Sequence, residues 1–270
     1  MTNRRTALVT GSSEGIGLEF CKELAAKGFD LILVARREDK LRKAAAVLTK
    51  NHGIACHVVP CDLAKVGAAQ SLYNQTRAKG LKVDFLVNNA GLLFMGAFDE
   101  IDLKKQEDLL AVNITALTSL THLYLQDMVA RKSGYILNVA STAAWIGIPL
   151  NNVYAASKSY VLAFTIALND EMNAKKTGVH VTAVCPNYTE TNMLHNAAQG
   201  AKLSIPRFMI LSADFVAKKG VTACLKGKAM IIPGISNRMN MLFVQMIPKL
   251  WMTRIFGIVY RKLQSSTGNS

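Results

Sequence analysis

Three side chains in the second half of the chain have the chemistry to transfer a proton. Tyr154 and Lys158 stand four residues apart, a spacing that puts them on one face of a helix, and Ser141 lies 13 positions before Tyr154. A phenol is a weak acid with an unperturbed pKa of about 10, but a neighbouring ammonium favours the phenolate. The pattern predicts Tyr154 as an acid or base, Lys158 as the group that lowers its pKa, and Ser141 as a hydroxyl that holds a substrate oxygen. Tyrosine and lysine at this spacing are also a common coincidence, so the prediction depends on a cofactor site elsewhere.

A glycine-rich turn near the start of the chain supplies such a site. Residues 7–10 are a short apolar run typical of a buried strand, and apolar residues at helical spacing follow the turn. Gly11 would allow a tight bend, Gly15 would let backbone N–H groups approach a pyrophosphate, and Gly17 would let helix and strand pack closely. A strand, a glycine-rich turn and a helix in this order predict a dinucleotide-binding site.

Together these motifs resemble the short-chain dehydrogenase/reductase family. The turn reads Thr10-Gly11, three residues, then Gly15-Ile16-Gly17, which is similar to the family's glycine motif, and Tyr154-x-x-x-Lys158 is similar to its catalytic pair. Further similar blocks extend the resemblance over residues 5–234.

Those further blocks follow later strands and one helix. They are the Asn-Asn-Ala-Gly element at 88–91, a helical asparagine at Asn113, and a loop at 186–191 in which Asn187 replaces the family's glycine. Asparagine adopts positive φ more readily than other non-glycine residues, so we expect the loop to tolerate Asn187.

The resemblance implies an oxidoreductase that uses a nicotinamide cofactor on an alcohol or carbonyl group, similar to hydroxysteroid dehydrogenases and 3-oxoacyl reductases. It implies that Lys158 also holds the nicotinamide ribose and that Asn113 keeps a water in line with Lys158; Asn113 could instead bond its own helix backbone. It implies no metal. The implied cofactor-binding residues are Gly11, Ser12, Ser13, Gly15, Ile16, Gly17, Arg36, Asp62, Leu63, Asn89, Ala90, Gly91, Tyr154, Lys158, Pro186, Asn187, Thr189 and Thr191.

The end of the second predicted strand favours NADP(H) over NAD. Val34-Ala35-Arg36-Arg37 contains no carboxylate to bind a ribose 2′-hydroxyl, whereas an arginine there accommodates a 2′-phosphate. We predict Arg36 as the phosphate ligand, with Ser12 as a helper; Arg37 could be only a solvated residue at a helix start. Asp62 would accept from the adenine amino group by resemblance, or cap the next helix.

Short β-branched runs alternate with helical stretches, a pattern typical of βαβ units. We predict an α/β fold: a single doubly wound Rossmann-like domain over residues 1–234, with a seven-stranded parallel sheet and helices on both faces, plus a C-terminal helical extension over residues 235–270. Right-handed crossovers would bring every motif to the carboxyl edge of the sheet. The expected strands are 6–10, 30–35, 56–60, 84–88, 134–139, 179–184 and 229–232.

The composition suits an intracellular enzyme with a sizeable core. The 270 residues are 50% hydrophobic, and the first of them lead into a strand without an apolar leader, so we expect a cytoplasmic protein. The five cysteines are scattered and the five histidines form no cluster, so neither type indicates a metal site.

The residues expected around the carbonyl group are apolar. They favour a ketone or alcohol on a large hydrophobic body, such as a steroid or a fatty acyl chain, over a sugar. Some could be ordinary core residues. They are Leu92, Leu93, Phe94, Met95, Trp145, Ile146, Pro149, Met193, Leu194, Phe208 and Met209.

Positive charge is concentrated late in the chain. The net charge is +14, and nine basic residues but no acidic one follow Asp214. Residues 249–263 predict a basic amphipathic helix with Trp251 and Phe256 on its apolar side, too interrupted by charge to span a bilayer. We favour packing of that side on the domain or a second subunit; the alternative is peripheral association of residues 235–263 with an anionic membrane. Without a recognised motif, the basic residues do not indicate nucleic-acid binding.

Two functions are compatible with these features. One is an NADPH-dependent oxidoreductase, expected to be a homo-oligomer, acting on a hydrophobic carbonyl or alcohol. The other is a catalytically weak, NADP-binding regulatory or membrane-peripheral scaffold of the same fold. The intact set Asn113, Ser141, Tyr154 and Lys158 favours the enzyme.

Overall fold

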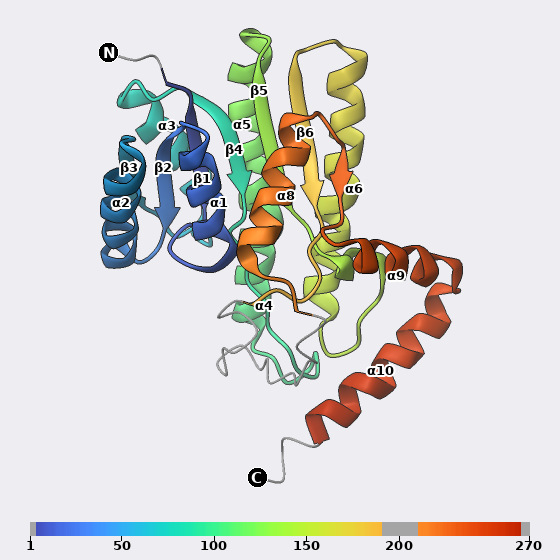
Figure 1. The fold of residues 1–270 in the computed structure, drawn as a ribbon. Helices are drawn as coiled ribbons and strands as arrows, with labels where there is room; N and C mark the ends of the chain where they lie inside the picture. The colour runs from blue at the N-terminus through green and yellow to red at the C-terminus, as the bar shows by residue number, and fades with distance from the viewer. Residues whose placement is uncertain (1–3, 191–209, 266–270) are drawn as a thin grey trace.

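The computed structural model describes residues 4–190 and 210–265. One seven-stranded sheet with the order β3-β2-β1-β4-β5-β6-β7 forms its centre, and all neighbouring strands are parallel (Figure 1). The predicted strands are confirmed, each end lying within one residue of the prediction. They are β1 (Thr6–Thr10), β2 (Asp30–Ala35), β3 (Cys56–Pro60), β4 (Val83–Asn88), β5 (Gly134–Val139), β6 (Val179–Val184) and β7 (Met230–Ile231).

Helices cover both faces of the sheet, which explains why the strands are apolar almost throughout. In β1, Ala7 and Val9 pack in one core layer while Leu8 packs in the other. The first layer is completed by α1 (Gly15–Ala26), α2 (Glu38–His52) and α8 (Ala213–Leu225), and the second by α3 (Ala68–Ala78), α5 (Leu117–Ala130) and α6 (Asn152–Ala174). The predicted doubly wound fold is therefore confirmed.

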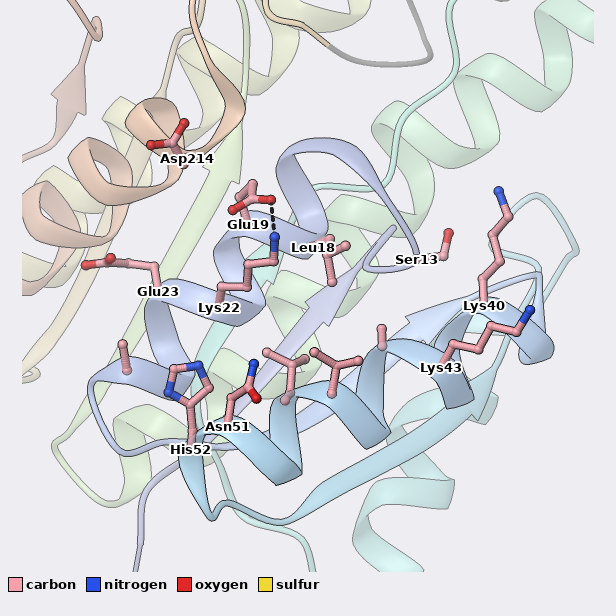
Figure 2. Close-up of a pocket in the computed structure, with 14 residues that line it drawn as sticks. Ser13, Leu18, Glu19, Lys22, Glu23, Lys40, Lys43, Asn51, His52 and Asp214 are labelled. Atoms are coloured by element: carbon pink, nitrogen blue, oxygen red, sulfur yellow. Dashed lines mark hydrogen bonds and ion pairs between the residues drawn. The ribbon is translucent and has the colours of Figure 1, made fainter.

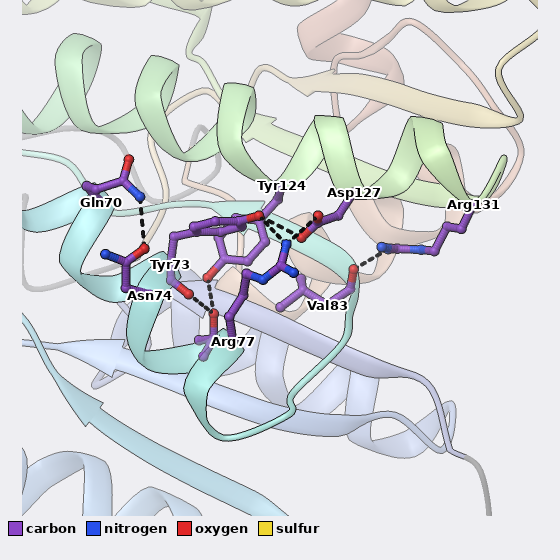
Figure 3. A network of polar contacts seen from close by, with 9 residues as sticks. Gln70, Tyr73, Asn74, Arg77, Val83, Tyr124, Asp127 and Arg131 are labelled. Atoms are coloured by element: carbon purple, nitrogen blue, oxygen red, sulfur yellow. Dashed lines mark hydrogen bonds and ion pairs between the residues drawn. The ribbon is translucent and has the colours of Figure 1, made fainter.

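A polar network joins α3 to α5 (Figure 3). Arg77 lies 3.0 Å from the Asp127 carboxylate, and the Tyr73 hydroxyl donates to the same carboxylate at 3.0 Å. Beneath them the hydroxyls of Thr76 and Tyr124 are 2.9 Å apart, and the Tyr73 and Tyr124 rings meet edge to face. These contacts hold the second helical layer together.

The strand order reverses between β1 and β4, and this reversal opens a crevice at the carboxyl edge. The Thr10 hydroxyl accepts from the backbone N–H groups of Asn89 and Ala90, each at 3.0 Å. In return, the Asn89 amide donates to the Thr10 carbonyl at 2.9 Å. Three hydrogen bonds thus tie the glycine turn to the residues after β4.

The remaining elements lie around the carboxyl edge. α4 (Leu103–Leu110) continues through a π-helical turn, η1 (Ala111–Ala116), into α5, and a 3₁₀ turn, η2 (Thr142–Trp145), follows β5. The predicted C-terminal extension consists of two helices, α9 (Ile235–Met246) and α10 (Lys249–Ser265), which form a bent pair on the side of the strands' carboxyl ends (Figure 1).

Only part of the apolar side of α10 packs on the domain. Met252 is buried in a cluster with Ile146, and Phe256 packs against that cluster. Trp251 and Ile258 are exposed. The apolar arc of the helix is therefore wider than its contact with the domain.

The glycine turn is held by close backbone contact. Gly11 and Gly15 have φ of +67° and +57°, as their predicted roles require. A Cβ added to Gly17 would lie 2.2 Å from the Gly11 carbonyl oxygen. Gly17 is thus needed for the helix to pack on the turn itself, more directly than on the strand.

Replacing Gly17 with alanine is expected to lower the free energy of unfolding by about 1–3 kcal/mol, the usual cost of overpacking. Helix propensity alone would predict stabilisation by about 1 kcal/mol. Urea unfolding of the G17A variant distinguishes the two. Gly67→Ala is the contrasting variant: its φ of +75° strains an alanine although the added Cβ would meet nothing within 4 Å, whereas Gly17 has no positive φ and its cost comes from contact alone. A stabilised G17A variant would contradict the close contact.

Candidate active site

A cleft of about 630 Å³ at the carboxyl edge of the sheet brings most of the predicted site residues together. Ser141, Tyr154 and Lys158 lie on its wall, with the glycine turn and the loops after β2, β3, β4 and β6. Another cavity, of about 700 Å³, lies between α1 and α2 (Figure 2). Its wall carries an ion pair between Lys22 and Glu19 and none of the predicted catalytic residues. The cleft at the sheet edge is therefore the candidate active site.

One end of the cleft has the features of a dinucleotide site. α1 begins at Gly15, and within the described residues its N-cap residue Glu14 makes no side-chain cap hydrogen bond. The N–H groups of the first turn are thus available to an anion. The predicted cofactor residues on this wall are Gly11, Ser13, Gly15, Ile16, Gly17, Arg36, Asp62, Leu63, Asn89, Ala90, Gly91, Pro186, Asn187 and Thr189.

Two predicted cofactor residues are not found on this wall. Ser12 is fully buried, and its hydroxyl donates to the Val34 carbonyl at 3.4 Å, so the structure does not place it as a phosphate ligand. Thr191 lies outside the described residues.

An acidic residue inside the glycine turn organises the basic residues after β2. Glu14 pairs with Arg37 at 2.6 Å and with Lys40 at 2.9 Å. Arg36 is exposed on the cleft wall and forms no ion pair within the described part of the chain. The three basic residues thus differ: Arg37 and Lys40 are held by Glu14, and Arg36 is left to contact a ligand. The sequence prediction missed this cluster, although an acid in the turn opposite an arginine pair could have indicated it.

Asp62 does not cap the next helix, because α3 begins at Ala68 and its N-cap residue is Gly67. The Asp62 carboxylate instead accepts from the backbone N–H of Ala64 at 3.2 Å, within the turn before that helix. The residue also lies on the cleft wall. This turn therefore orients the carboxylate at the edge of the cofactor end.

The predicted catalytic residues lie side by side. Tyr154 and Lys158 occupy successive turns near the start of α6, and Lys158 Nζ is 5.6 Å from the centre of the Tyr154 ring. The side chain of Ser141 hydrogen-bonds Tyr154, and Ser141 Oγ also accepts from the Ala143 N–H at 3.1 Å, which fixes it at the start of η2. The prediction that these three residues meet is confirmed.

Burial sets the protonation of this trio. Lys158 is buried, its ammonium donates to the Val139 carbonyl at 2.8 Å, and burial lowers its pKa to about 8 from 10.5. Burial also raises the pKa of Tyr154, and the bond with Ser141 only partly opposes this. The predicted lowering of the Tyr154 pKa by Lys158 is not seen in this structure, in which desolvation is the largest cause of the shift and Lys158 is not one of its causes. Tyr154 is therefore a protonated phenol at neutral pH.

Asn113 lies in η1, where a π-helical turn interrupts the helix, a feature frequent at functional sites. Its side chain accepts from the Leu92 N–H at 2.8 Å and donates to the Leu92 carbonyl at 3.0 Å and to Ser157 Oγ at 3.1 Å. The alternative that it bonds its own helix backbone is not what these bonds show. A Cβ added to Gly91 would lie 3.4 Å from Asn113 Oδ1 and 3.7 Å from Lys158 Nζ. Asn113 therefore holds the loop after β4 beside Lys158.

Asn187 is held by the C-terminal extension. Its amide donates to Asn237 of α9 at 3.1 Å, and its carbonyl oxygen accepts from Thr142 at 3.2 Å. Asn187 is absent from the described non-glycine residues with positive φ, so the readiness of asparagine to adopt positive φ is not the reason that the loop tolerates it. Side-chain bonding, not left-handed backbone, accounts for asparagine here. No sequence motif indicated Asn237, which lies beyond the family-like blocks.

The substrate end of the cleft is apolar, but partly for reasons that the sequence missed. Leu92, Leu93, Met95 and Ile146 line it as predicted, whereas Phe94, Trp145 and Pro149 do not; Trp145 packs into the core instead. Met193, Leu194, Phe208 and Met209 fall outside the described residues. The unpredicted lining residues are Ile148, Met241, Val244, Phe256 and Val259, of which the last four belong to α9 and α10.

Residues 5–202 match the family described as short chain dehydrogenase. The chain belongs to this family. Among its relatives, a very-long-chain 3-oxoacyl-CoA reductase of Anas platyrhynchos is 35% identical over 75% of this chain and 63% of its own length. A human 17-beta-hydroxysteroid dehydrogenase type 3 is 33% identical over 71% of this chain and 64% of its own length. This chain therefore matches less than two thirds of the length of these relatives.

Solved structures agree with the fold. A 7beta-hydroxysteroid dehydrogenase has a TM-score of 0.84 at 25% identity, covering 93% of this chain and 96% of its own. A short-chain dehydrogenase from Sphingobium yanoikuyae in complex with NADPH has a TM-score of 0.79 at 28% identity, covering 88% of this chain and 92% of its own. The chain thus shares the architecture of these oxidoreductases over most of its length.

Because Lys158 is buried, we expect it to lower the stability of the folded protein. Replacing it with methionine is expected to raise the free energy of unfolding at pH 7 by about 1–3 kcal/mol. The fall in the Lys158 pKa from 10.5 to about 8 on folding corresponds to a cost of about 3 kcal/mol, and the variant also loses the hydrogen bond to Val139, which offsets part of the gain. Between these pH values the unfolded wild type binds a proton that the folded form does not, so wild-type stability rises with pH there. The advantage of K158M should therefore shrink from pH 8 to 10.5.

Urea unfolding of both proteins across this pH range measures the difference, in which all other titrating groups cancel. Lys175→Met, at the exposed end of the same helix, is the matched control and should change stability little. A K158M variant less stable than wild type at pH 7 would contradict the desolvation argument.

Proposed function

We propose that the protein is an NADPH-dependent oxidoreductase that reduces a ketone, or oxidises the corresponding alcohol, on a hydrophobic molecule. The observation that carries the proposal is the meeting in one cleft of Ser141, Tyr154 and Lys158 with an uncapped helix start at the glycine turn. The three side chains can transfer a proton, and the helix start can bind a pyrophosphate.

The chain's own residues protonate and hydrogen-bond the oxygen of the substrate. A bound nicotinamide supplies the hydride, or accepts it in the reverse direction. Tyr154 gives its hydroxyl proton to the carbonyl oxygen, and its raised pKa keeps that proton available at neutral pH. Ser141 donates to the same oxygen and stabilises the negative charge that develops there. The ammonium of Lys158 stabilises the phenolate that Tyr154 becomes.

Asn113 supports this chemistry from outside the cleft. Both amide hydrogens of its side chain donate, to Leu92 and Ser157, and its oxygen accepts from Leu92, so it keeps the loop after β4 in place beside Lys158. For the predicted water in line with Lys158, we propose that the backbone of η1 supplies the contact, because a π-helical turn displaces the usual backbone pairing. That water replenishes the proton of Tyr154.

NADPH is preferred because the charge after β2 is positive. Arg36 lies on the cleft wall and forms no ion pair with a described residue, and Glu14, the acid in the turn, is neutralised by Arg37 and Lys40. The Sphingobium yanoikuyae relative in complex with NADPH, 28% identical, supports this choice. We assign the 2′-phosphate to Arg36 and the adenine to Asp62.

The substrate class follows from the lining of the cleft. Leu93, Ile146, Met241 and Val244 make the substrate end apolar, which suits a steroid or fatty acyl body. The relatives include a very-long-chain 3-oxoacyl-CoA reductase and hydroxysteroid dehydrogenases, which supports substrates of this kind.

We propose that the enzyme is a cytoplasmic homo-oligomer. Its five cysteines are free, as in a reducing compartment. Leu110, Tyr160 and Ile166 expose apolar surface on α4 and α6, which a second subunit would cover. A monomer in sedimentation equilibrium would contradict the assembly.

Replacing Tyr154 with phenylalanine is expected to lower kcat at least 100-fold, the usual contribution of a general acid, and to leave NADPH affinity within about twofold of wild type. NADPH oxidation with a panel of lipophilic ketones measures turnover, and fluorescence titration measures binding. Tyr160→Phe is the matched control, because this tyrosine lies on the outer side of the same helix and bonds only Thr118 among the described residues. A Y154F variant with most of its turnover would refute the assignment. NADPH binding by wild type without turnover of any ketone would favour the scaffold alternative.

Replacing Arg36 with alanine is expected to raise KM for NADPH about 10- to 100-fold, the usual loss for a hydrogen bond to a charged group, and to change KM for NADH little. Arg37→Ala is the comparison and should have the smaller effect, because Glu14 already pairs with Arg37. Wild-type enzyme that prefers NADH would overturn the cofactor choice.

A further inference from the structure

One face of α9 is apolar along its whole length and is left uncovered by the described residues. The opposite face, with Asn237 and Met241, is buried against the domain. Contiguous large apolar side chains are rarely exposed on a soluble protein unless they form an interaction site. The exposed ones are Ile235, Met239, Leu242, Phe243 and Met246, and Ile235 and Met246 are 85% and 83% exposed.

The second helix also exposes apolar residues. α10 turns Met252 towards the domain and exposes apolar residues on its other side. We call the exposed apolar residues of both helices the C-terminal apolar surface: those of α9 named above with Leu250, Trp251, Ile255 and Ile258. Trp251 is 65% exposed, and tryptophan is a side chain typical of membrane interfaces.

Basic side chains border the C-terminal apolar surface. Arg238 lies on α9, and Lys249, Arg254 and Arg261 lie on α10; all four are exposed. None of them forms an ion pair within the described ranges, and the sequence contains no acidic residue after Asp214. An apolar face bordered by positive charge alone is complementary to an anionic lipid surface.

We propose that the C-terminal apolar surface docks the protein on an anionic membrane, with α9 and α10 lying in the interface. A second copy of the chain is the less suitable occupant, because a symmetric pairing of this surface would bring like charges together. No single described helix has the length and apolar composition to cross a membrane; α9 with residues 249–259 does by these criteria, but the pair is bent by 120°. The proposal is therefore one of surface docking.

Docking would place the active site at the lipid surface, a consequence that rests on the proposed function. The inner faces of the same two helices supply Met241, Val244 and Phe256 to the cleft wall. Val259 both lines the cleft and is 46% exposed, so the cleft and the docking surface meet on α10. A lipophilic ketone could then pass from the bilayer into the cleft without crossing water.

Flotation of the full-length protein with vesicles tests the docking directly and without reference to activity. Wild type is expected to float with vesicles of equal phosphatidylglycerol and phosphatidylcholine, to float at least tenfold less with phosphatidylcholine alone, and to be released by high salt. The double variant Phe243→Gln, Trp251→Gln should lose at least tenfold in binding. Val47→Gln with Val66→Gln is the matched control, because both valines are exposed on other elements, and it should bind as wild type does.

Three outcomes would overturn the docking. The first is that wild type fails to float with anionic vesicles. The second is that binding resists alkaline carbonate, because this would mean insertion into the bilayer. A dimer dissociated by the double variant, with no vesicle binding, would assign the surface to a second copy. Turnover of a water-soluble ketone should be the same in the double variant and wild type, so loss of docking and failure of the proposed enzyme function are separate results.

Discussion

The hydroxyl of Thr10 holds together the two halves of the cofactor site. It is buried at the end of β1, accepts from two backbone N–H groups after β4 and donates to the Val87 carbonyl. A parallel sheet whose order reverses at β1 and β4 opens a crevice there. The crevice can bind a cofactor only if the glycine turn after β1 and the residues after β4 stay at a fixed distance. The bonds of Thr10 and Asn89 set that distance, and every other element of the site is arranged around it.

The catalytic side of the cleft is built from groups that are unfavourable to bury. Lys158 has a buried ammonium whose hydrogen bond within the described residues goes to one backbone carbonyl, and Tyr154 has its phenol in an environment that opposes ionisation. Such groups persist because the surrounding fold over-determines their place. The Val139 carbonyl and the loop held by Asn113 provide that support.

The sequence predicted the parts of the protein that depend on local pattern. The alternation of strands and helices predicted the sheet. The glycine turn and the Tyr154 to Lys158 spacing predicted the two ends of the cleft, because each motif follows a strand and parallel strands end at one edge. It did not predict the Glu14 cluster or the bond from Asn187 to Asn237, since each joins residues distant in the chain without a periodic pattern. The direction of the Tyr154 pKa shift could not be predicted from the sequence either, because spacing shows a neighbouring charge but not the extent of burial.

The extension links substrate recognition to the cofactor loop. Asn237 bonds Asn187 while Met241 and Val244, one and two turns later on α9, line the apolar end of the cleft. Deuterium tracing tests most directly whether this cleft transfers a hydride to a lipophilic carbonyl. With NADPH that carries deuterium at both C4 positions of the nicotinamide, mass spectrometry should find one deuterium on the carbinol carbon of the product alcohol, and none with the Y154F variant over the same time. Tight NADPH binding with no deuterium in any product would contradict the claim.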